Sequence, residues 1–388
     1  SLCNLLLERR GRKLRLFRNF SLVLGLKGDE MTILLGILAV AVMFGFVIMI
    51  HEFGHFIVAK KLKVKVLDFA FGFGPPIFKW TKNETRYSVR PIPFGGFVKM
   101  AGEEIDEIGG APDEFFSKKW YERIAIVSAG AIMNYISAFI IFLFIISVWG
   151  LQHQRPVVKL VEKKSPAFIA GLSAADEIVA INGNKIEDAG IVSKIVKTST
   201  DKELVFSVKR KEEILDIKIT PKYDEKIKMS RIGIVYDMSS EPIVVKVGFT
   251  KAIKESFNQI IFWTVTPLKY LYMKLTLWEA PSEVSGPVGI MQAAYHAAKL
   301  GLKTFLYFIA IVSVALGMFN LLPIPIVDGG HIAFYLFEGI SRKKLNKKVM
   351  QFANSIGFAL LITLALYATY QDILRTKNGF WKRVEQVK

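Results

Sequence analysis

The stretch "VIMIHEFGHFIVAKK", residues 47–61, places two histidines and a glutamate at the end of an apolar run. The twenty residues before His51 contain no charged side chain, and about 20 residues is the length with which a helix crosses the hydrocarbon core of a bilayer. Ionisable groups inside a membrane helix cost at least about 2.5–3.5 kcal/mol each on insertion scales, so they normally serve a function. The stretch therefore predicts a membrane helix that carries a reactive site.

The rest of the chain also has the character of a membrane protein. Hydrophobic residues make up 52% of its 388 residues, more than an ordinary soluble domain contains. Four windows without Asp, Glu, Lys or Arg are long enough to span a bilayer: 31–51, 124–152, 304–327 and 349–371. The last window begins with polar residues, so a buried soluble helix is its alternative. We predict a multi-pass α-helical membrane protein with four transmembrane helices.

The distribution of charge predicts the orientation in the membrane. The net charge of +18 comes from basic residues that flank the apolar windows and have few aromatics among them, so no nucleic-acid partner is expected. Lysines and arginines are concentrated between windows one and two and between windows three and four, which predicts that both loops are cytoplasmic. Residues 153–303 and both termini then lie on the outer side of a bacterial cytoplasmic (inner) membrane.

Residues 1–30 do not fit this orientation, because seven of them are lysine or arginine. We interpret them as an N-terminal extension outside the working fold. A signal peptide is an alternative, but no A-x-A-like cleavage site follows the apolar run. The single cysteine, Cys3, lies in this extension, so no disulfide can form within the chain.

Residues 67–103 interrupt the first half of the membrane core, which we place at 31–152. They alternate aromatic and β-branched residues with Gly and Pro, a pattern typical of short strands and tight turns. Non-helical backbone is tolerated at membrane depth only when it is buried in protein or lines a wet cavity. We therefore predict a membrane re-entrant β-hairpin beside the reactive site, with a plain cytoplasmic hairpin as the alternative.

Residues 155–222 change to short alternating runs with polar turns, which predicts a compact extracytoplasmic α/β domain. Its stretch "SPAFIAGLSAADEIVAINGNKI" (165–186) resembles a PDZ domain of the permuted bacterial type, with Ala175 where a glycine is usual. Such a PDZ-like domain either takes an extended peptide as an added strand or acts only as a size filter. A connector (223–303) follows it, with an interfacial or an ordinary packing helix over 250–280. The second half of the membrane core (304–375) and a tail (376–388) complete the chain.

The H-E-x-x-H pattern of His51, Glu52 and His55 sets two imidazoles one helical turn apart, where they can share one ion. A catalytic zinc site has three protein ligands and one open position. Asp328, in "GMFNLLPIPIVDGGH" (317–331), is the first candidate for the third ligand, and His331 is its rival. Prolines and glycines are expected to break the helix around Asp328, and the Asn320 amide could hold a substrate backbone.

HEFGH (51–55) and N-x-x-P-x-P-x-x-D-G (320–329) together resemble the site-2 protease family of intramembrane zinc metalloproteases. The similarity to its bacterial branch, that of the regulator of sigma-E protease RseP, extends over residues 31–375. It includes "GFGP" (72–75), "R-x-IPFGGFVKMAGE" (90–103), the PDZ-like domain and "SGPVGI" (285–290). Two departures are a single PDZ-like domain where RseP has two, and Ala131 where that branch often has proline.

The resemblance implies a zinc metalloendopeptidase (EC 3.4.24.-) with His51, His55 and Asp328 as ligands of Zn2+ and Glu52 as the general base. It also implies that the 67–103 segment contacts the substrate, and the expected contact residues are Gly72, Gly74, Gly95, Gly96, Phe97 and Asn320. The expected substrates are single-span membrane proteins in the lipid bilayer, such as anti-sigma factors or signal-peptide remnants, cleaved after a first extracytoplasmic cut. An unwound substrate helix exposes polar backbone, which an edge strand of the 67–103 segment could bind by β-augmentation.

Overall fold

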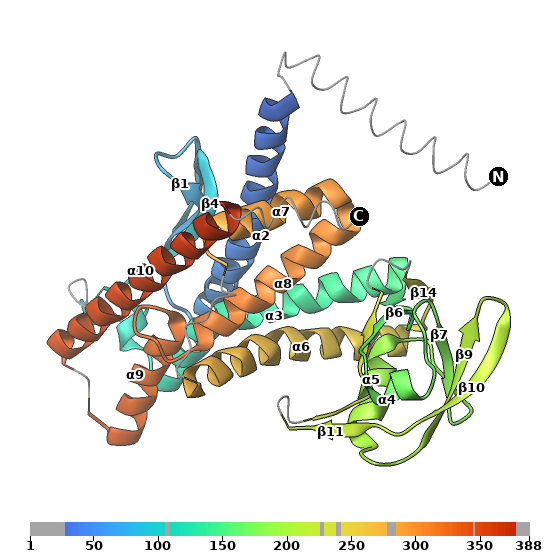
Figure 1. The fold of residues 1–388 in the computed structure, drawn as a ribbon. Coiled ribbons are helices and arrows are strands. Elements are labelled where there is room, and N and C mark those ends of the chain that lie inside the picture. The colour runs from blue at the N-terminus through green and yellow to red at the C-terminus, as the bar shows by residue number, and fades with distance from the viewer. Residues whose placement is uncertain are drawn as a thin grey trace. The chain divides into compact units, whose positions relative to one another are not determined.

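The computed structural model describes residues 28–104, 109–225, 229–237, 242–277, 285–343 and 346–377 (Figure 1). Most of the predicted extension (1–30) and of the predicted tail (376–388) lies outside these ranges. The chain forms two compact units. One unit contains the residues up to Ile145 together with those from Ile253 onward, and the other spans Ile146–Ala252.

Within the described residues, four helices are long and apolar enough to cross a membrane, as the sequence predicted. They are α2 (Gly28–Lys61), α3 (Trp120–Trp149), α8 (Leu302–Leu321) and α10 (Lys347–Lys377). Large apolar side chains are exposed along each of them, for example Ile37, Ile140, Phe319 and Leu366. Lipid is the environment that such exposed apolar side chains require.

The first three spans pack around small and branched side chains. Met43 and Val47 of α2 form a cluster with Ala294 of α7 (Pro287–Leu300) and Ile309 of α8. A second cluster joins α3 to α8. Gly54 allows α2 to cross α3 closely, since a Cβ there would lie 2.7 Å from the carbonyl carbon of Ala129. The close crossing places the end of α2 that carries HEFGH directly against α3.

The 67–103 segment forms strands as predicted, but it is a four-stranded sheet and not a single hairpin. The strands are β1 (Val66–Phe73), β2 (Phe78–Lys82), β3 (Thr85–Val89) and β4 (Ile92–Met100), in the order β2-β3-β1-β4. The β2–β3 hairpin folds back so that β3 pairs parallel to β1, while β4 pairs antiparallel to the other side of β1. This leaves β4 as an edge strand, and it lies against α2 (Figure 1).

Two further helices of this unit bear on the predictions. The helix expected over 250–280 is α6 (Phe249–Thr276). The "SGPVGI" motif begins α7, and the buried Asp372 of α10 accepts a hydrogen bond from the Gly289 N–H of α7 at 2.7 Å. This contact fixes α10 to α7.

The second unit has the α/β character predicted for 155–222. Its main sheet has the order β10-β9-β7-β8, and two helices, α4 (Pro166–Ile169) and α5 (Ala189–Thr198), accompany it. The strands of this sheet are β7 (Glu177–Ile181), β8 (Asn184–Lys185), β9 (Leu204–Arg210) and β10 (Glu213–Ile219). The side chains of Ile178, Phe206 and Val208 are fully buried in its core. Ala175, at the position where glycine is usual, has a φ of +69°, a left-handed conformation that favours glycine.

Short strand pairs surround that sheet and extend past residue 222. β6 (Val158–Val161) pairs with β13 (Ile234–Tyr236), and β5 (Leu151–His153) pairs with β14 (Ile243–Val245). β11 (Lys222–Asp224) pairs with β12 (Met229–Arg231). The α/β unit therefore takes up strands from the first part of the predicted connector.

Candidate active site

His51, Glu52 and His55 lie near the C-terminal end of α2, and the two histidines face the same side of the helix. Their ring centroids are 4.7 Å apart and their Nε2 atoms 3.2 Å apart. His51 is buried, with 7% of its surface exposed, and His55 is half-buried. The Nδ1–H of His55 donates to the carbonyl oxygen of Ile126 in α3 at 2.9 Å, which leaves its Nε2 as the free lone pair.

Asp328 reaches the histidine pair from a break between two helices. Helix α8 ends at Leu321, and α9 begins at Asp328 and runs to Ser341. The prolines lie in the break, as predicted, but the two glycines belong to the first turn of α9. A Cβ at Gly329 would lie 2.6 Å from the carbonyl oxygen of Leu321, so only glycine allows the turn to press against the break.

The break also holds a strained residue. Ile326, two residues before Asp328, has a φ of +82°. A β-branched side chain at positive φ is a conformational outlier, and such outliers are concentrated at functional sites. The strained backbone belongs to the segment that carries the Asp328 carboxylate to the histidines.

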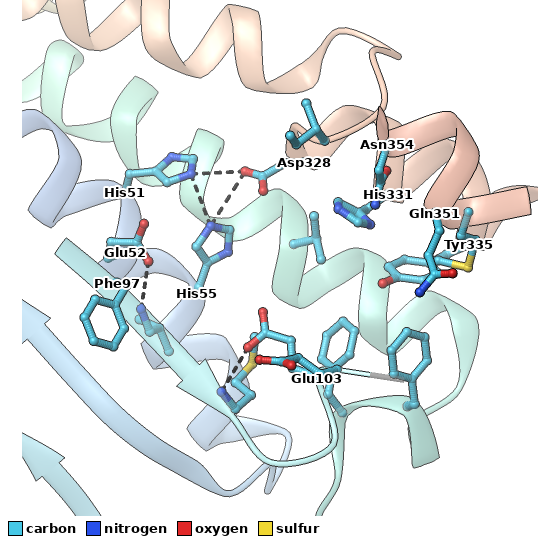
Figure 2. A pocket seen from close by; sticks show the side chains of 18 residues that line it. His51, Glu52, His55, Phe97, Glu103, Asp328, His331, Tyr335, Gln351 and Asn354 are labelled. Atoms are coloured by element: carbon cyan, nitrogen blue, oxygen red, sulfur yellow. Dashed lines mark hydrogen bonds and ion pairs between the residues drawn. The ribbon is translucent and has the colours of Figure 1, made fainter. Parts of the chain in front are cut away.

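The carboxylate meets both imidazoles. Asp328 Oδ2 lies 3.1 Å from His51 Nε2 and 3.6 Å from His55 Nε2 (Figure 2). This buried oxygen has no hydrogen-bond partner among the described residues. His331 lies three residues further on, with its ring stacked near Tyr335 and not against the histidine pair. The structure thus brings Asp328, and not its rival, to His51 and His55.

The three side chains fit a zinc ion. One ligand atom from each lies within 4.8 Å of the others. Zinc bonds to histidine nitrogen and carboxylate oxygen are about 2.0–2.2 Å long, and the edge of such a tetrahedron is roughly 3.4 Å. The observed separations of 3.1, 3.2 and 3.6 Å bracket that edge. A buried carboxylate oxygen without a donor beside two imidazole nitrogens is the donor set of a catalytic zinc site.

Glu52 connects the site to the edge strand. Its Oε2 accepts a hydrogen bond from the Val98 N–H of β4 at 3.1 Å (Figure 2). β1 occupies the opposite side of β4, so this N–H belongs to the free edge of the strand. Gly96 allows β4 to pair closely with β1 at this point, because a Cβ there would lie 2.6 Å from the carbonyl oxygen of Ala70 in β1.

A cavity of about 540 Å3 opens beside the four residues His51, Glu52, His55 and Asp328. Its polar lining also includes Glu103, just after β4, His331 of α9, and Gln351 and Asn354 of α10 (Figure 2). A cavity of this size accommodates several residues of an extended peptide.

The expected substrate residues divide into two groups. Phe97 lines the cavity, and Gly95 and Gly96 lie beside it on β4. Gly72, Gly74 and Asn320 are not among the described residues that line it. Gly72, at a φ of +87°, has a local role instead, because a Cβ would lie 2.8 Å from the carbonyl oxygens of both Arg90 and Ile92.

Two residues of α3 beside the histidines escaped the sequence reasoning. A Cβ at Gly130 would lie 2.7 Å from Cε1 of His51, and the fully buried Asn134 amide lies 3.3 Å from His51 Nδ1. A signal for them exists in the sequence. Asn134 is a strongly polar residue inside the second apolar window, and Gly130 lies one helical turn before it.

Comparison with known proteins agrees with this site. The model of peptidase family M50 matches residues 39–364. A Clostridium acetobutylicum protein described as a zinc metalloprotease is 36% identical over 339 residues, which cover 86% of this chain and 96% of that protein. The regulator of sigma-W protease RasP of Bacillus subtilis is 28% identical over 421 residues, which cover 87% of this chain and 98% of RasP.

A solved structure matches a smaller part. The PDZ domain of an SdrC-like protein from Listeria monocytogenes is 21% identical, with a TM-score of 0.20, over 22% of this chain and 90% of that domain. The family assignment depends on the matches that cover most of the chain. With its four span-length apolar helices and its HExxH helix, the chain belongs to peptidase family M50, the site-2 protease family, and is a zinc metalloprotease of the membrane.

Proposed function

We propose that this protein is an intramembrane endopeptidase that cleaves single-span membrane proteins within their transmembrane segment. The observation that carries the proposal is the meeting of His51 and His55, on a helix of membrane-span length, with Asp328, which follows the break after another such helix. A protease for soluble substrates would be expected to hold its HExxH helix in a soluble domain, whereas here the motif belongs to the first span.

In the proposed mechanism His51, His55 and Asp328 hold the zinc ion. When bound there, a zinc ion would make a water molecule acidic enough to act as a nucleophile at neutral pH and would polarise the scissile carbonyl. Glu52 stands one residue from His51 with its carboxylate beside β4. It takes the proton from the attacking water and later gives it to the leaving amine.

Substrate backbone would be held by the edge of β4. A transmembrane helix must unwind before cleavage, and each unsatisfied backbone group in hydrocarbon costs several kcal/mol. The free edge of β4 passes the Glu52 carboxylate, so a segment added to this strand would lie in reach of the catalytic residues. Phe97, which lines the cavity, would contact a side chain of that segment.

A membrane-inserted position of the sheet is part of the proposal. Large apolar side chains are exposed on the outer strand β2, just before it, and at the paired ends of β1 and β4: Ile77, Phe78, Trp80, Phe73 and Ile92. Exposed apolar groups gathered in this way favour contact with lipid over contact with water. They support a re-entrant sheet more than a plain cytoplasmic one.

The α/β unit would act on the extracytoplasmic side as a PDZ-like domain. The positive-inside distribution of lysines and arginines supports that orientation. A cleft of about 210 Å3 lies between α5 and the segment of β12 and β13, lined in part by Val196, Ile232 and Tyr236. This cleft supports peptide binding as an added strand, while a domain without a ligand would act as a size filter.

The biological role would be regulated intramembrane proteolysis in the bacterial cytoplasmic membrane. The name of the RasP relative connects it to a sigma factor. Release of an anti-sigma factor after a first extracytoplasmic cut is the outcome that we propose, with signal-peptide remnants as further substrates.

Purified full-length protein in liposomes tests the proposal with two substrates, a single-span helix and an unfolded soluble polypeptide. Wild type should contain one zinc ion and cleave only the helix, within its membrane segment. Glu52→Gln should keep zinc and lose cleavage, and Asp328→Asn should weaken both. Cleavage by Glu52→Gln would refute the mechanism, and preference for the soluble polypeptide would refute the intramembrane function.

A further inference from the structure

Helix α3 presents three successive turns to the histidine pair. Ile126, Gly130 and Asn134 follow one another at intervals of four residues, so they share one face of the helix. The carbonyl oxygen of Ile126 accepts from His55, Gly130 leaves room for both rings, and the Asn134 amide lies at His51. The α3 ribbon passes directly behind the two histidines (Figure 2). This face of α3 therefore serves as the support of the metal ligands.

The two histidines are supported in different ways. His55 depends on a backbone carbonyl, which no side-chain substitution removes. His51 has the amide of Asn134 at 3.3 Å from its Nδ1, and this is a side-chain partner. Metal-ligating histidines almost always donate their second ring N–H to an acceptor, which fixes the tautomer and the direction of the ring. Asn134 stands where that acceptor has to be for His51.

The orientation of the amide decides whether it can play this part. When Nδ2 of Asn134 points toward the His51 ring, Oδ1 of Asn134 is buried without a hydrogen-bond partner among the described residues. The two ends of an amide have nearly the same shape, so a half-turn exchanges them without moving any neighbour. After the half-turn, Oδ1 of Asn134 accepts a hydrogen bond from the Nδ1–H of His51, and the Nε2 of His51 is unprotonated with its lone pair free.

We propose that Asn134 is the positioning residue of His51: its Oδ1 accepts the Nδ1–H and so holds Nε2 ready for zinc. The inference rests on the proposed zinc site. Neighbouring hydroxyl groups hold this part of α3 in place, because Ser137 and Ser313 both donate to the carbonyl oxygen of Asn134. The amide is thus presented from a fixed turn of the helix.

Two substitutions separate the effect of the hydrogen-bond acceptor from the effect of the side-chain shape. Asn134→Leu keeps the branched shape of the asparagine side chain, although it is bulkier, and has no hydrogen-bonding atom, whereas Asn134→Asp keeps an oxygen acceptor of the same size and loses the amide nitrogen. Loss of such an outer partner typically weakens metal binding about 10–100-fold. We expect this loss for Asn134→Leu and close to wild-type zinc affinity for Asn134→Asp. Ile145→Val, a conservative substitution at a buried position of the same helix eleven residues after Asn134, is the matched control and should bind zinc like wild type.

The measurement is zinc affinity of the full-length protein in detergent, by competition with a chromogenic chelator. The visible spectrum of the cobalt-loaded protein reports ligand geometry and should change in Asn134→Leu alone. Wild-type affinity and spectrum in Asn134→Leu would overturn the inference. Weak zinc binding by Asn134→Asp would also overturn the inference, because the amide nitrogen of Asn134 would then be the partner of His51. The Asn134→Asp measurement alone decides the question if Asn134→Leu does not fold. Loss of zinc in His51→Ala and Asp328→Asn shows separately that the proposed metal site is correct.

Discussion

Replacing Gly130 by alanine tests how closely α3 is fitted to the histidine pair. The added Cβ would lie 2.6 Å from Cε1 of His55 and 2.7 Å from Cε1 of His51. Carbon atoms in contact are normally about 3.5–4.0 Å apart, so both rings would have to retreat by roughly 0.8 Å. A zinc site tolerates deviations of only about 0.2 Å in its ligand distances. The required retreat is several times larger, and we expect Gly130→Ala to lose zinc.

The fold should survive this substitution. The new methyl group meets the far ends of side chains, which can swing aside, and alanine favours a helix interior over glycine by about 1 kcal/mol. Gly36→Ala in α2 is the matched control. Its Cβ would meet Tyr295 at 3.5 Å, an ordinary contact, so it receives the same helix preference without touching the histidines.

Three measurements on purified full-length protein check the prediction: zinc content, cleavage of a single-span helix and thermal unfolding of the zinc-free form. Gly130→Ala should contain little zinc, show no cleavage, and unfold no earlier than zinc-free wild type. Gly36→Ala should match wild type in zinc content and cleavage. Stoichiometric zinc with normal cleavage in Gly130→Ala would refute the reasoning, because the rings would then have room that the geometry denies them.

Three further outcomes are expected. Burial alone would raise the pKa of Asp176, but hydrogen bonds from Arg210 and from the Ser173 N–H prevail and lower it. These hydrogen bonds stabilise the folded domain fully above the ordinary Asp pKa of 3.8, and the stabilisation is lost as the pH falls through the lowered pKa of the folded state. Amide hydrogen exchange in β7 and β9 should therefore become faster as the pH falls through that range. The same change in Asp176→Asn should be smaller. Asp372→Ala should lower the unfolding temperature, since a hydrogen bond to a charged group contributes about 1.5–3 kcal/mol, whereas Thr363→Ala, at an exposed position of the same helix, should not. A strong chelator should abolish cleavage and added zinc should restore it in wild type, but Glu52→Gln should stay inactive under both conditions.

The spans and the histidine pair could be predicted because their signals are local. A run of apolar residues determines a membrane helix by its length, and a spacing of four puts His51 and His55 on one face whatever surrounds them. Asp328 could be singled out because it is the one carboxylate in the stretch 317–331, directly after the third apolar window. Its approach to the histidines depends on α8, the break and α9 together, and only the structure shows that approach.

The missing parts of the prediction are contacts between distant segments. Alternation of side chains indicates strands, but it does not tell that β3 returns to pair parallel with β1 and leaves β4 at the edge. Glycines 329 and 330 were expected to break the helix around Asp328, whereas they lie in the first turn of α9, where the absence of a Cβ allows this turn to pack against the backbone of the preceding break. Asn134 was passed over since its partner, His51, is 83 positions away.

The left-handed backbone at Ile326 makes the two halves of the site unequal. Conformations of this kind cost of order 1–3 kcal/mol and persist only where neighbouring structure enforces them. His51 and His55 lie on an uninterrupted helix that needs no such enforcement, whereas Asp328 follows a strained backbone segment that depends on its neighbours. The position of the Asp328 carboxylate should therefore depend more than that of the imidazoles on the packing around the break, and substitutions that loosen this packing should displace the carboxylate first.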